Sequence, residues 1–134
     1  MKINKINIRT NTKNYSILIG RGLINKIDKI FKNNNITFEK CLIVADKNIP
    51  YTFKKTLYKK LKSKKIFKIE LVPSEKNKNY TTIEKIHKIL FERRFNRSDC
   101  VISFGGGIIG DIVGFASSTF KRGLKFINIP STLL

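Results

Sequence analysis

Glycines concentrate in one stretch of the chain, Ser103–Gly123, which reads SFGGGIIGDIVGFASSTFKRG. Three of them, Gly105–Gly107, stand in a row between an apolar run and a segment with helical spacing. Because glycine has no Cβ, this backbone can approach a ligand closely, and a helix beginning near Ile108 would present free N–H groups and its dipole to an anion. The GxGxxG spacing that ends at Gly110 is that of dinucleotide-binding loops. The stretch therefore predicts a turn that binds pyrophosphate.

The surroundings of this turn differ from those of an ordinary dinucleotide loop. The turn follows a late strand, and Lys121–Leu134 holds no acidic residue, whereas the usual ribose-binding acid lies about 20 residues beyond the glycines. An acid at a strand end lies upstream instead, at Asp46. Asp111, in the first helical turn, either favours the helix dipole or faces a nicotinamide or a ribose hydroxyl. The alternative interpretation is a tight strand–helix turn without a ligand.

Alternating strands and helices are expected to position these residues. Continuous apolar runs, typical of strands buried on both faces, occur at Cys41–Asp46 and Cys100–Phe104. Further strands are expected at Ile66–Val72 and Phe126–Ile129, and helices at Leu23–Phe31, Phe53–Leu61, Ile83–Phe91 (capped by Thr81 or Thr82) and Ile108–Phe120.

The N-terminal segment has a different hydrophobic periodicity. Lys2–Arg9 alternates with period two, and Tyr15–Ile19 is a second short run ended by turn residues. This pair predicts an antiparallel hairpin of half-buried strands. Together with the alternating elements, it predicts an α/β fold: a Rossmann-like, mostly parallel sheet with flanking helices, right-handed crossovers and an N-terminal antiparallel hairpin.

Composition bounds the class of protein. The chain has 134 residues, of which 41 % are hydrophobic, enough for one domain with a real core. The N-terminal residues lack the apolar region of a signal peptide, and no apolar run reaches the length of a membrane span. We therefore expect a cytoplasmic location and no membrane partner.

The net charge of +19 raises the question of nucleic-acid binding. Lys residues are scattered, with modest density at Lys54–Lys65, and aromatic residues are not interleaved with them as a stacking platform requires. Abundant Lys, Asn and Ile together are typical of AT-rich codon usage. The expectation is therefore that the chain binds no nucleic acid, with a small basic nucleic-acid-binding protein kept as the alternative from another class.

Three further residues could carry chemistry. Cys41 and Cys100 each lie in a strand-like apolar run, which indicates small buried residues rather than a disulfide or a metal pair. His87, the single histidine, flanks the apolar face of a helix without acidic or Cys partners at ligand spacing. A structural role is expected for it.

The residues from Gly105 to Leu134 resemble the signature region of the 3-dehydroquinate synthase family. That family reads GGG-x-x-GD-x-x-GF-A, then [YF]-x-RG, then IPTTLL, and this chain follows the pattern with few departures. Val44–Asn48 resembles the family's ribose-binding strand end, and Val72–Lys78 resembles its PxGExxK motif without the glycine. The resemblance covers the whole chain but only the N-terminal part of the family's length.

The resemblance implies an NAD- and metal-dependent phosphate lyase and cyclase. The family converts 3-deoxy-D-arabino-heptulosonate 7-phosphate into 3-dehydroquinate and phosphate, in the shikimate pathway to aromatic amino acids, with transient use of NAD. Residues 1–134 would be the NAD-binding domain. The helical domain with the ligands of a divalent metal (zinc or cobalt, held by one Glu and two His) would lie outside this chain. A homodimer is implied for the full-length enzyme.

The roles of individual residues follow from the resemblance, position by position. Asp46 and Asn48 would bind the adenosine ribose, and Glu75 and Lys78 would line the nucleotide site. Asp111 would lie near the nicotinamide. Arg122 would hold the substrate phosphate, across a dimer interface, with an exposed surface charge as the alternative. The remaining cofactor contacts are backbone amides and hydroxyls: Gly106, Gly107, Ile108, Ile109, Gly110, Ser131 and Thr132.

Two expectations remain open to other interpretations. The apolar end PSTLL predicts a chain truncated at its C-terminal side, so the isolated 134-residue chain is expected to be inactive and to hold no catalytic or metal-binding residue of its own. Within the fold, another sugar phosphate cyclase, of the 2-deoxy-scyllo-inosose or valiolone synthase type, is the alternative. A related metal-dependent alcohol or glycerol-phosphate dehydrogenase fits less well, because KRG and IPSTLL follow the synthase pattern.

Overall fold

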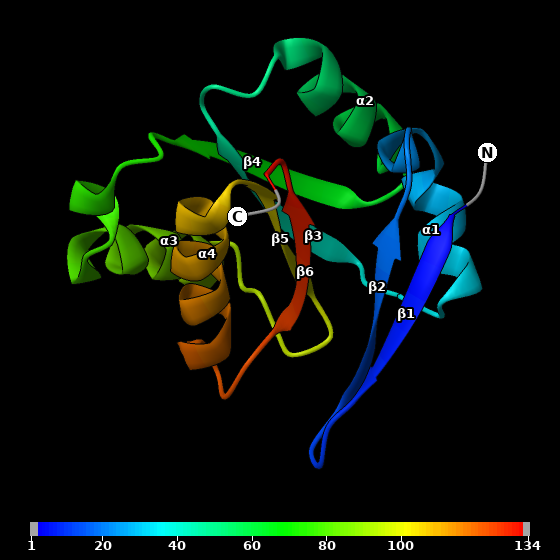
Figure 1. The fold of residues 1–134 in the computed structure, drawn as a ribbon. Helices are drawn as coiled ribbons and strands as arrows, with labels where there is room; N and C mark the ends of the chain where they lie inside the picture. Colours follow the sequence, from blue (N-terminus) through cyan, green and yellow to red (C-terminus); the bar gives the residue numbers. More distant parts are fainter. Residues whose placement is uncertain (1–2, 133–134) are drawn as a thin grey trace.

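A four-stranded parallel sheet forms the centre of the computed structural model, which describes residues 3–132 (Figure 1). Lys2 of the expected hairpin and Leu133 and Leu134 of the IPSTLL motif lie outside the described residues. The strands lie in the order β4-β3-β5-β6. Their bounds are β3 Lys40–Asp46, β4 Lys65–Leu71, β5 Cys100–Gly105 and β6 Lys125–Pro130. The predicted α/β fold with a parallel sheet is confirmed.

Helices cover both faces of this sheet. Those of one face are α3 (Tyr80–Glu92) and α4 (Gly107–Thr119), and those of the other are α1 (Ile27–Asn33) and α2 (Tyr51–Lys60). All six residues of β5 and all but the first residue of β3 are buried. Each of these two strands contributes side chains to both cores, which explains why its sequence is a continuous apolar run.

The two cysteines are neighbours within the sheet. Cys41 and Cys100 are register partners on β3 and β5, and both are free and fully buried. A hydrogen bond with the Cys100 thiol and burial raise the pKa of Cys41 well above its usual range. The Cys41 thiol therefore stays protonated, and both cysteines serve as small buried packing groups, as predicted.

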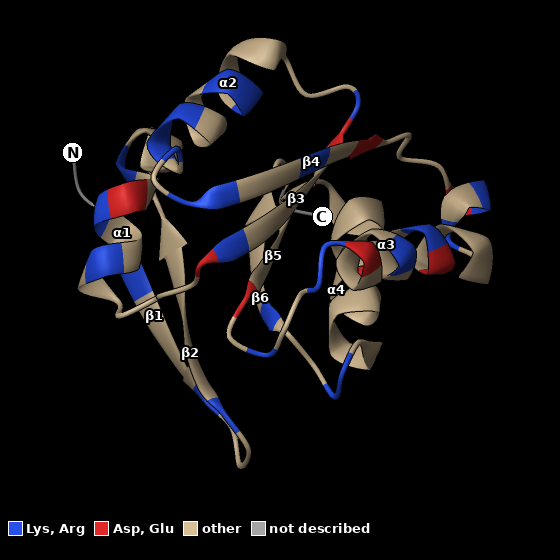
Figure 2. Cartoon of the chain, turned by 180° about the vertical axis from the view of Figure 1, so that it is seen from behind, with Lys and Arg blue, Asp and Glu red and all other residues tan. Residues whose placement is uncertain are grey.

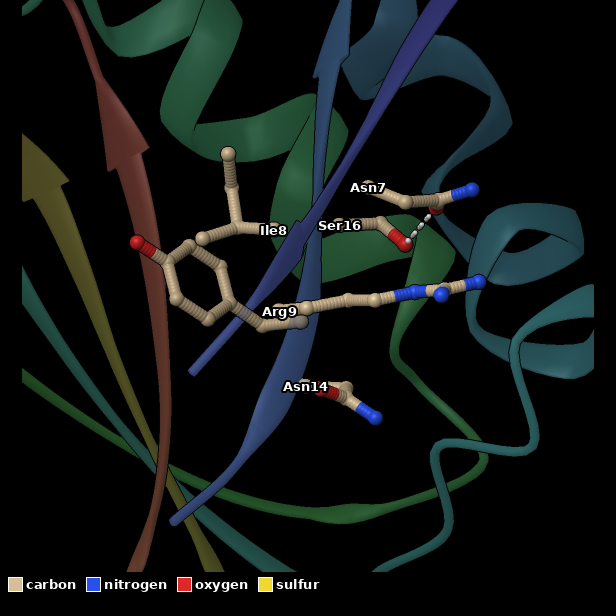
Figure 3. A pocket seen from close by; sticks show the side chains of 6 residues that line it. Asn7, Ile8, Arg9, Asn14 and Ser16 are labelled. Atoms are coloured by element: carbon tan, nitrogen blue, oxygen red, sulfur yellow. Dashed lines mark hydrogen bonds between the residues drawn. The ribbon is translucent and has the colours of Figure 1, made fainter. Parts of the chain in front are cut away.

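The hairpin of β1 (Asn4–Arg9) and β2 (Asn14–Ile19) is antiparallel, as predicted, but its expected burial was wrong. Nearly all of its residues are exposed, with Ile6 at 47 % and its partner Ile17 at 41 %. The side chains do alternate as the pattern indicated: in Figure 3, Ile8 points to one side of the hairpin and Arg9 to the other. Period two separates an apolar face from a polar one, but it does not provide a layer to cover the apolar face.

Element boundaries differ from expectation at two helices. The cap of α3 is Asn79, whose side chain accepts a hydrogen bond from the Thr82 N–H at 2.9 Å, so the predicted cap at Thr81 or Thr82 was wrong. Asn at an N-cap competes well with Thr because its carbonyl oxygen reaches the same amide. The first predicted helix is divided into a 3₁₀ turn, η1 (Leu23–Lys26), and α1.

Basic residues are spread over many elements rather than gathered in one cluster (Figure 2). The view from behind shows them on α1, α2 and α3, on the sheet strands and in the connecting loops. Within residues 3–132, no helix combines the length and apolar character that crossing a membrane requires.

Candidate functional site

A pocket of about 420 Å³ lies at the carboxyl ends of the sheet strands, where ligands bind in open parallel sheets. Four separate segments of the chain contribute to it. The residues that line it are Asp46, Pro73, Glu75, Lys78, Gly106, Gly107, Ile108, Asp111, Ser131 and Thr132. Nine of these were predicted as site residues, and Pro73, which lies inside the quoted PxGExxK-like segment, was not.

Asp46 ends β3 and is only 8 % exposed. Its Oδ1 accepts a hydrogen bond from the Asn48 backbone N–H at 2.7 Å, which fixes the carboxylate and the start of the following loop together. The Asn48 side chain is exposed and does not line the pocket. The structure therefore places Asp46 at the pocket and Asn48 beside it.

The glycine turn supplies space and free amides. Gly106 caps α4 without any side-chain hydrogen bond, and a Cβ added to Gly107 would meet nothing within 4 Å. First-turn amides of a helix have no carbonyl partner inside the helix, and two pocket-lining residues, Gly107 and Ile108, occupy this turn of α4. The turn can therefore receive an anion, aided by the helix dipole.

Two of the predicted amide contacts are not at the pocket. The Gly110 N–H donates to the Gly106 carbonyl at 3.0 Å, so it is already used inside the helix, and the prediction that it is free for a ligand was wrong. Ile109 is fully buried in the core under α4 and does not line the pocket. Gly110 instead allows a close approach to β6, since a Cβ there would lie 3.3 Å from Asn128 Oδ1.

Lys78 connects two sides of the pocket. Its Nζ lies 2.8 Å from Asp111 Oδ2 and 3.9 Å from Glu75 Oε2. Asp111 is the fifth residue of α4, so the prediction that it lies in the first helical turn was wrong. The hydrogen bond and charge of Asp111, followed by the charge of Glu75, raise the pKa of Lys78 above its ordinary value. The ammonium group therefore stays charged at neutral pH and offers a cation beside the α4 amides.

The segment with the missing glycine forms a short 3₁₀ turn, η2 (Glu75–Asn77). Ser74 caps it by accepting a hydrogen bond from the Lys76 N–H at 3.3 Å. Despite the absent glycine, Glu75 and Lys78 both reach the pocket lining.

Ser131 and Thr132 close the pocket beyond β6. The Ser131 N–H donates to the Gly105 carbonyl at 2.8 Å, which ties this segment to the end of β5. The Thr132 hydroxyl oxygen lies 3.3 Å from where a Cβ on Gly106 would be. Both residues therefore stand next to the glycine turn.

Arg122 and His87 lie elsewhere. Arg122 follows the C-terminal end of α4, opposite the pocket, where it is exposed with a φ of 66°. The predicted contact of Arg122 with a substrate phosphate therefore lies outside this pocket. His87 Nε2 lies 2.9 Å from the Ala116 carbonyl and 3.1 Å from the Thr119 hydroxyl, which joins α3 to α4.

The donor set of the pocket fits NAD better than a metal ion. A carboxylate at a strand end suits ribose hydroxyls, and helix amides with a lysine suit a pyrophosphate. Among residues 3–132, no three His, Cys, Asp or Glu side chains are grouped as a metal site would need. What the pocket can do chemically is hold and orient a dinucleotide.

Comparisons with known solved structures show the same fold. A 2-deoxy-scyllo-inosose synthase, solved as a complex with carbaglucose-6-phosphate, NAD+ and Co2+, matches 96 % of this chain and 35 % of its own with a TM-score of 0.83 at 16 % identity. ValA, a 2-epi-5-epi-valiolone synthase from Streptomyces hygroscopicus subsp. jinggangensis 5008 with NAD+ and Zn2+ bound, matches 72 % of this chain and 28 % of its own, with a TM-score of 0.64 at 25 % identity.

Sequence comparisons are more specific. The 3-dehydroquinate synthase of Pelagibacter ubique (strain HTCC1062) is 49 % identical over 134 residues, covering 100 % of this chain and 36 % of the relative. That of Clostridium botulinum (strain Alaska E43 / Type E3) is 39 % identical, covering 91 % of this chain and 35 % of the relative. The chain thus spans about a third of the length of these curated relatives.

A family model described as 3-dehydroquinate synthase N-terminal matches residues 68–134. This match includes η2, the glycine turn and the segment after β6, and therefore most of the pocket lining. Together with the identity to the Pelagibacter ubique and Clostridium botulinum synthases, it shows that the chain belongs to the 3-dehydroquinate synthase family.

Proposed function

We propose that this chain is the NAD-binding part of a 3-dehydroquinate synthase. The whole enzyme would convert 3-deoxy-D-arabino-heptulosonate 7-phosphate into 3-dehydroquinate and phosphate, in the shikimate pathway. The observation that carries this proposal is the convergence of Asp46, Lys78, Asp111 and the glycine turn on one pocket at the carboxyl ends of the strands. These are the groups that the family pattern assigns to the cofactor.

Each side chain of the pocket has a binding task in this proposal. Asp46 accepts hydrogen bonds from the adenosine ribose, and the amides of Gly107 and Ile108 donate to the pyrophosphate. Lys78 balances the pyrophosphate charge, and Asp111 lies toward the nicotinamide. When bound, NAD supplies a transient acceptor for hydride from a substrate hydroxyl; the protein supplies orientation and electrostatics.

The hydroxyls of Ser131 and Thr132 complete the proposed cofactor contacts, next to the glycine turn. Arg122 would reach the substrate phosphate from a second subunit, where its fork can bind two oxygens at once. A divalent metal, zinc or cobalt, would be held by ligands outside this chain. We further propose a cytoplasmic homodimer as the working form, acting on a small sugar phosphate.

A fusion experiment tests the proposed function. Residues 1–134 would be joined to the part of the Pelagibacter ubique synthase that lies beyond the matched region. We expect the fusion to release phosphate from the heptulosonate phosphate, and to do so only with NAD and metal present. The isolated 134-residue chain should release none. Turnover of glucose 6-phosphate or sedoheptulose 7-phosphate instead would favour another sugar phosphate cyclase; turnover by the isolated chain would contradict the proposal.

Replacing Asp46 by Asn should weaken NAD binding about 10-fold, because a neutral amide forms weaker hydrogen bonds to ribose than a carboxylate does. The amide oxygen can still accept from the Asn48 N–H, so the loop should keep its shape. Binding of NADP should weaken less than that of NAD, because removing the carboxylate also removes its repulsion of the 2′-phosphate. Titration calorimetry with both nucleotides measures this. An unchanged NAD to NADP ratio would count against ribose binding by Asp46.

A further inference from the structure

We propose that Lys54, which does not line the pocket, is a positioning residue for the adenosine side of the cofactor site. Lys54 lies on α2 and is only 4 % exposed, although it carries an ammonium group. It occupies the same helical face as the buried Leu57 and Leu61, where spacing would favour an apolar residue. A buried ammonium group at such a position needs partners that hold it.

The partners of Lys54 fasten the loop after β3. Its Nζ lies 2.6 Å from Glu70 Oε1 on β4 and donates to the Lys47 carbonyl at 3.3 Å. On the other side of the same residue, the Lys47 N–H donates to the Leu71 carbonyl at 2.9 Å. Lys47 is therefore held through both its N–H and its carbonyl.

These hydrogen bonds to Lys47 restrain the loop beside Asp46, the residue proposed to bind the adenosine ribose. Lys47 stands between Asp46, which lines the pocket, and Asn48, whose N–H donates to the Asp46 carboxylate at 2.7 Å. If Lys47 moves, the peptide between the carboxylate and its donor moves too. Lys54 thereby acts on the ribose through Lys47, without touching the ligand.

The role proposed for Lys54 does not extend to the lysine at the other end of α2. Lys60, on the same helix, pairs with Asp28 of α1 at 3.6 Å and has a side chain that is 35 % exposed. That pair joins two helices at the surface and does not contact the β3–α2 loop. It provides a matched control in which an ion pair of α2 is removed without loosening Lys47.

The test compares Lys54→Met, Lys54→Arg and Lys60→Met in the full 134-residue chain. The inference rests on the proposed binding of NAD, so dissociation constants for NAD, AMP and nicotinamide mononucleotide are measured by calorimetry. We expect Lys54→Met to weaken NAD and AMP about 10-fold, because the Lys47 carbonyl loses its partner and the loop that carries the Asp46 carboxylate is held less firmly. The mononucleotide should bind as before, Lys54→Arg should recover most of the affinity, and Lys60→Met should match the parent.

Amide hydrogen exchange of Lys47, followed by NMR without nucleotide, gives an independent readout. Exchange at Lys47 should accelerate in Lys54→Met and stay unchanged in Lys60→Met. If Lys54→Met does not fold, Glu70→Gln replaces it, with a smaller change in the same direction. Unchanged AMP affinity and unchanged Lys47 exchange would overturn the inference, as would equal loss of AMP and mononucleotide. If the parent chain binds no NAD, the proposed function fails while the exchange experiment still decides the role of Lys54.

Discussion

Replacing Gly107 by valine should raise the dissociation constant for NAD at least about 100-fold, because it would separate the pyrophosphate from two helix amides, each forming a charge-assisted hydrogen bond. The free energy of unfolding should stay within about 0.5 kcal/mol of the parent value. A Cβ at this position meets nothing within 4 Å, so the protein itself has room for the new side chain. Valine also has a better helix propensity than glycine, which favours the start of α4.

Calorimetric titration with NAD and urea denaturation of the same sample check this prediction. Gly107→Ala serves as the graded control, since one methyl group intrudes less and should cause a smaller loss of affinity. If the valine variant bound NAD as the parent does, the pyrophosphate would not lie against this turn. A loss of affinity accompanied by unfolding would instead show that the space at Gly107 is needed by the fold.

Replacing Gly105 by valine should have the opposite signature, a loss of about 3 kcal/mol in the free energy of unfolding from overpacking. A Cβ at Gly105 would lie 2.9 Å from Ile109 Cβ and Cγ1 and 3.0 Å from Asp46 Cβ. Neither neighbour has room to move, because Ile109 is fully buried and Asp46 is 8 % exposed. The two adjacent segments would have to separate.

The shift of the urea midpoint measures the loss at Gly105. Gly20→Ala is the matched control, since a Cβ there would make only ordinary contacts at 3.6 Å and should leave stability nearly unchanged. A midpoint equal to that of the parent in Gly105→Val would mean that β5 and α4 can separate freely at this turn. Two glycines of the same turn therefore have different roles: Gly105 permits close packing, and Gly107 leaves space on the pocket side.

The central sheet could be predicted from the sequence because its chemistry is local. An apolar run such as Cys41–Asp46 is suited only to a strand covered on both faces, and the structure has it in that setting. The burial of the hairpin could not be predicted in the same way. Ile6 and Ile17 indicate which face is apolar, but whether another layer covers that face depends on residues far along the chain.

The candidate site shows the same division. Three glycines in a row and an acid at a strand end, Asp46, are local signals, and the structure brings Gly106, Gly107 and Asp46 together at the pocket. The free amides were harder to assign, because a sequence defines the first residue of a helix only to within one or two positions. The Gly110 N–H is not free, since it donates to the Gly106 carbonyl inside the helix. Lys54 was missed because its sequence setting resembles other lysines of α2. The one available signal was its spacing with Leu57 and Leu61 on the buried face.

The sheet order has a consequence for the newborn polypeptide. β3 is synthesised before its two neighbours in the sheet, β4 and β5, and β5 begins only at residue 100. A ribosome that pauses before that point leaves one edge of β3 unpaired, although six of its seven residues are buried in the folded protein, and such an exposed apolar edge favours aggregation or chaperone binding. The pocket is lined by residues from Asp46 to Thr132, so the nucleotide proposed to bind there can stabilise the fold only after β6 has emerged. Translation speed across Leu71–Cys100 should therefore govern the yield of folded protein more than the supply of nucleotide does.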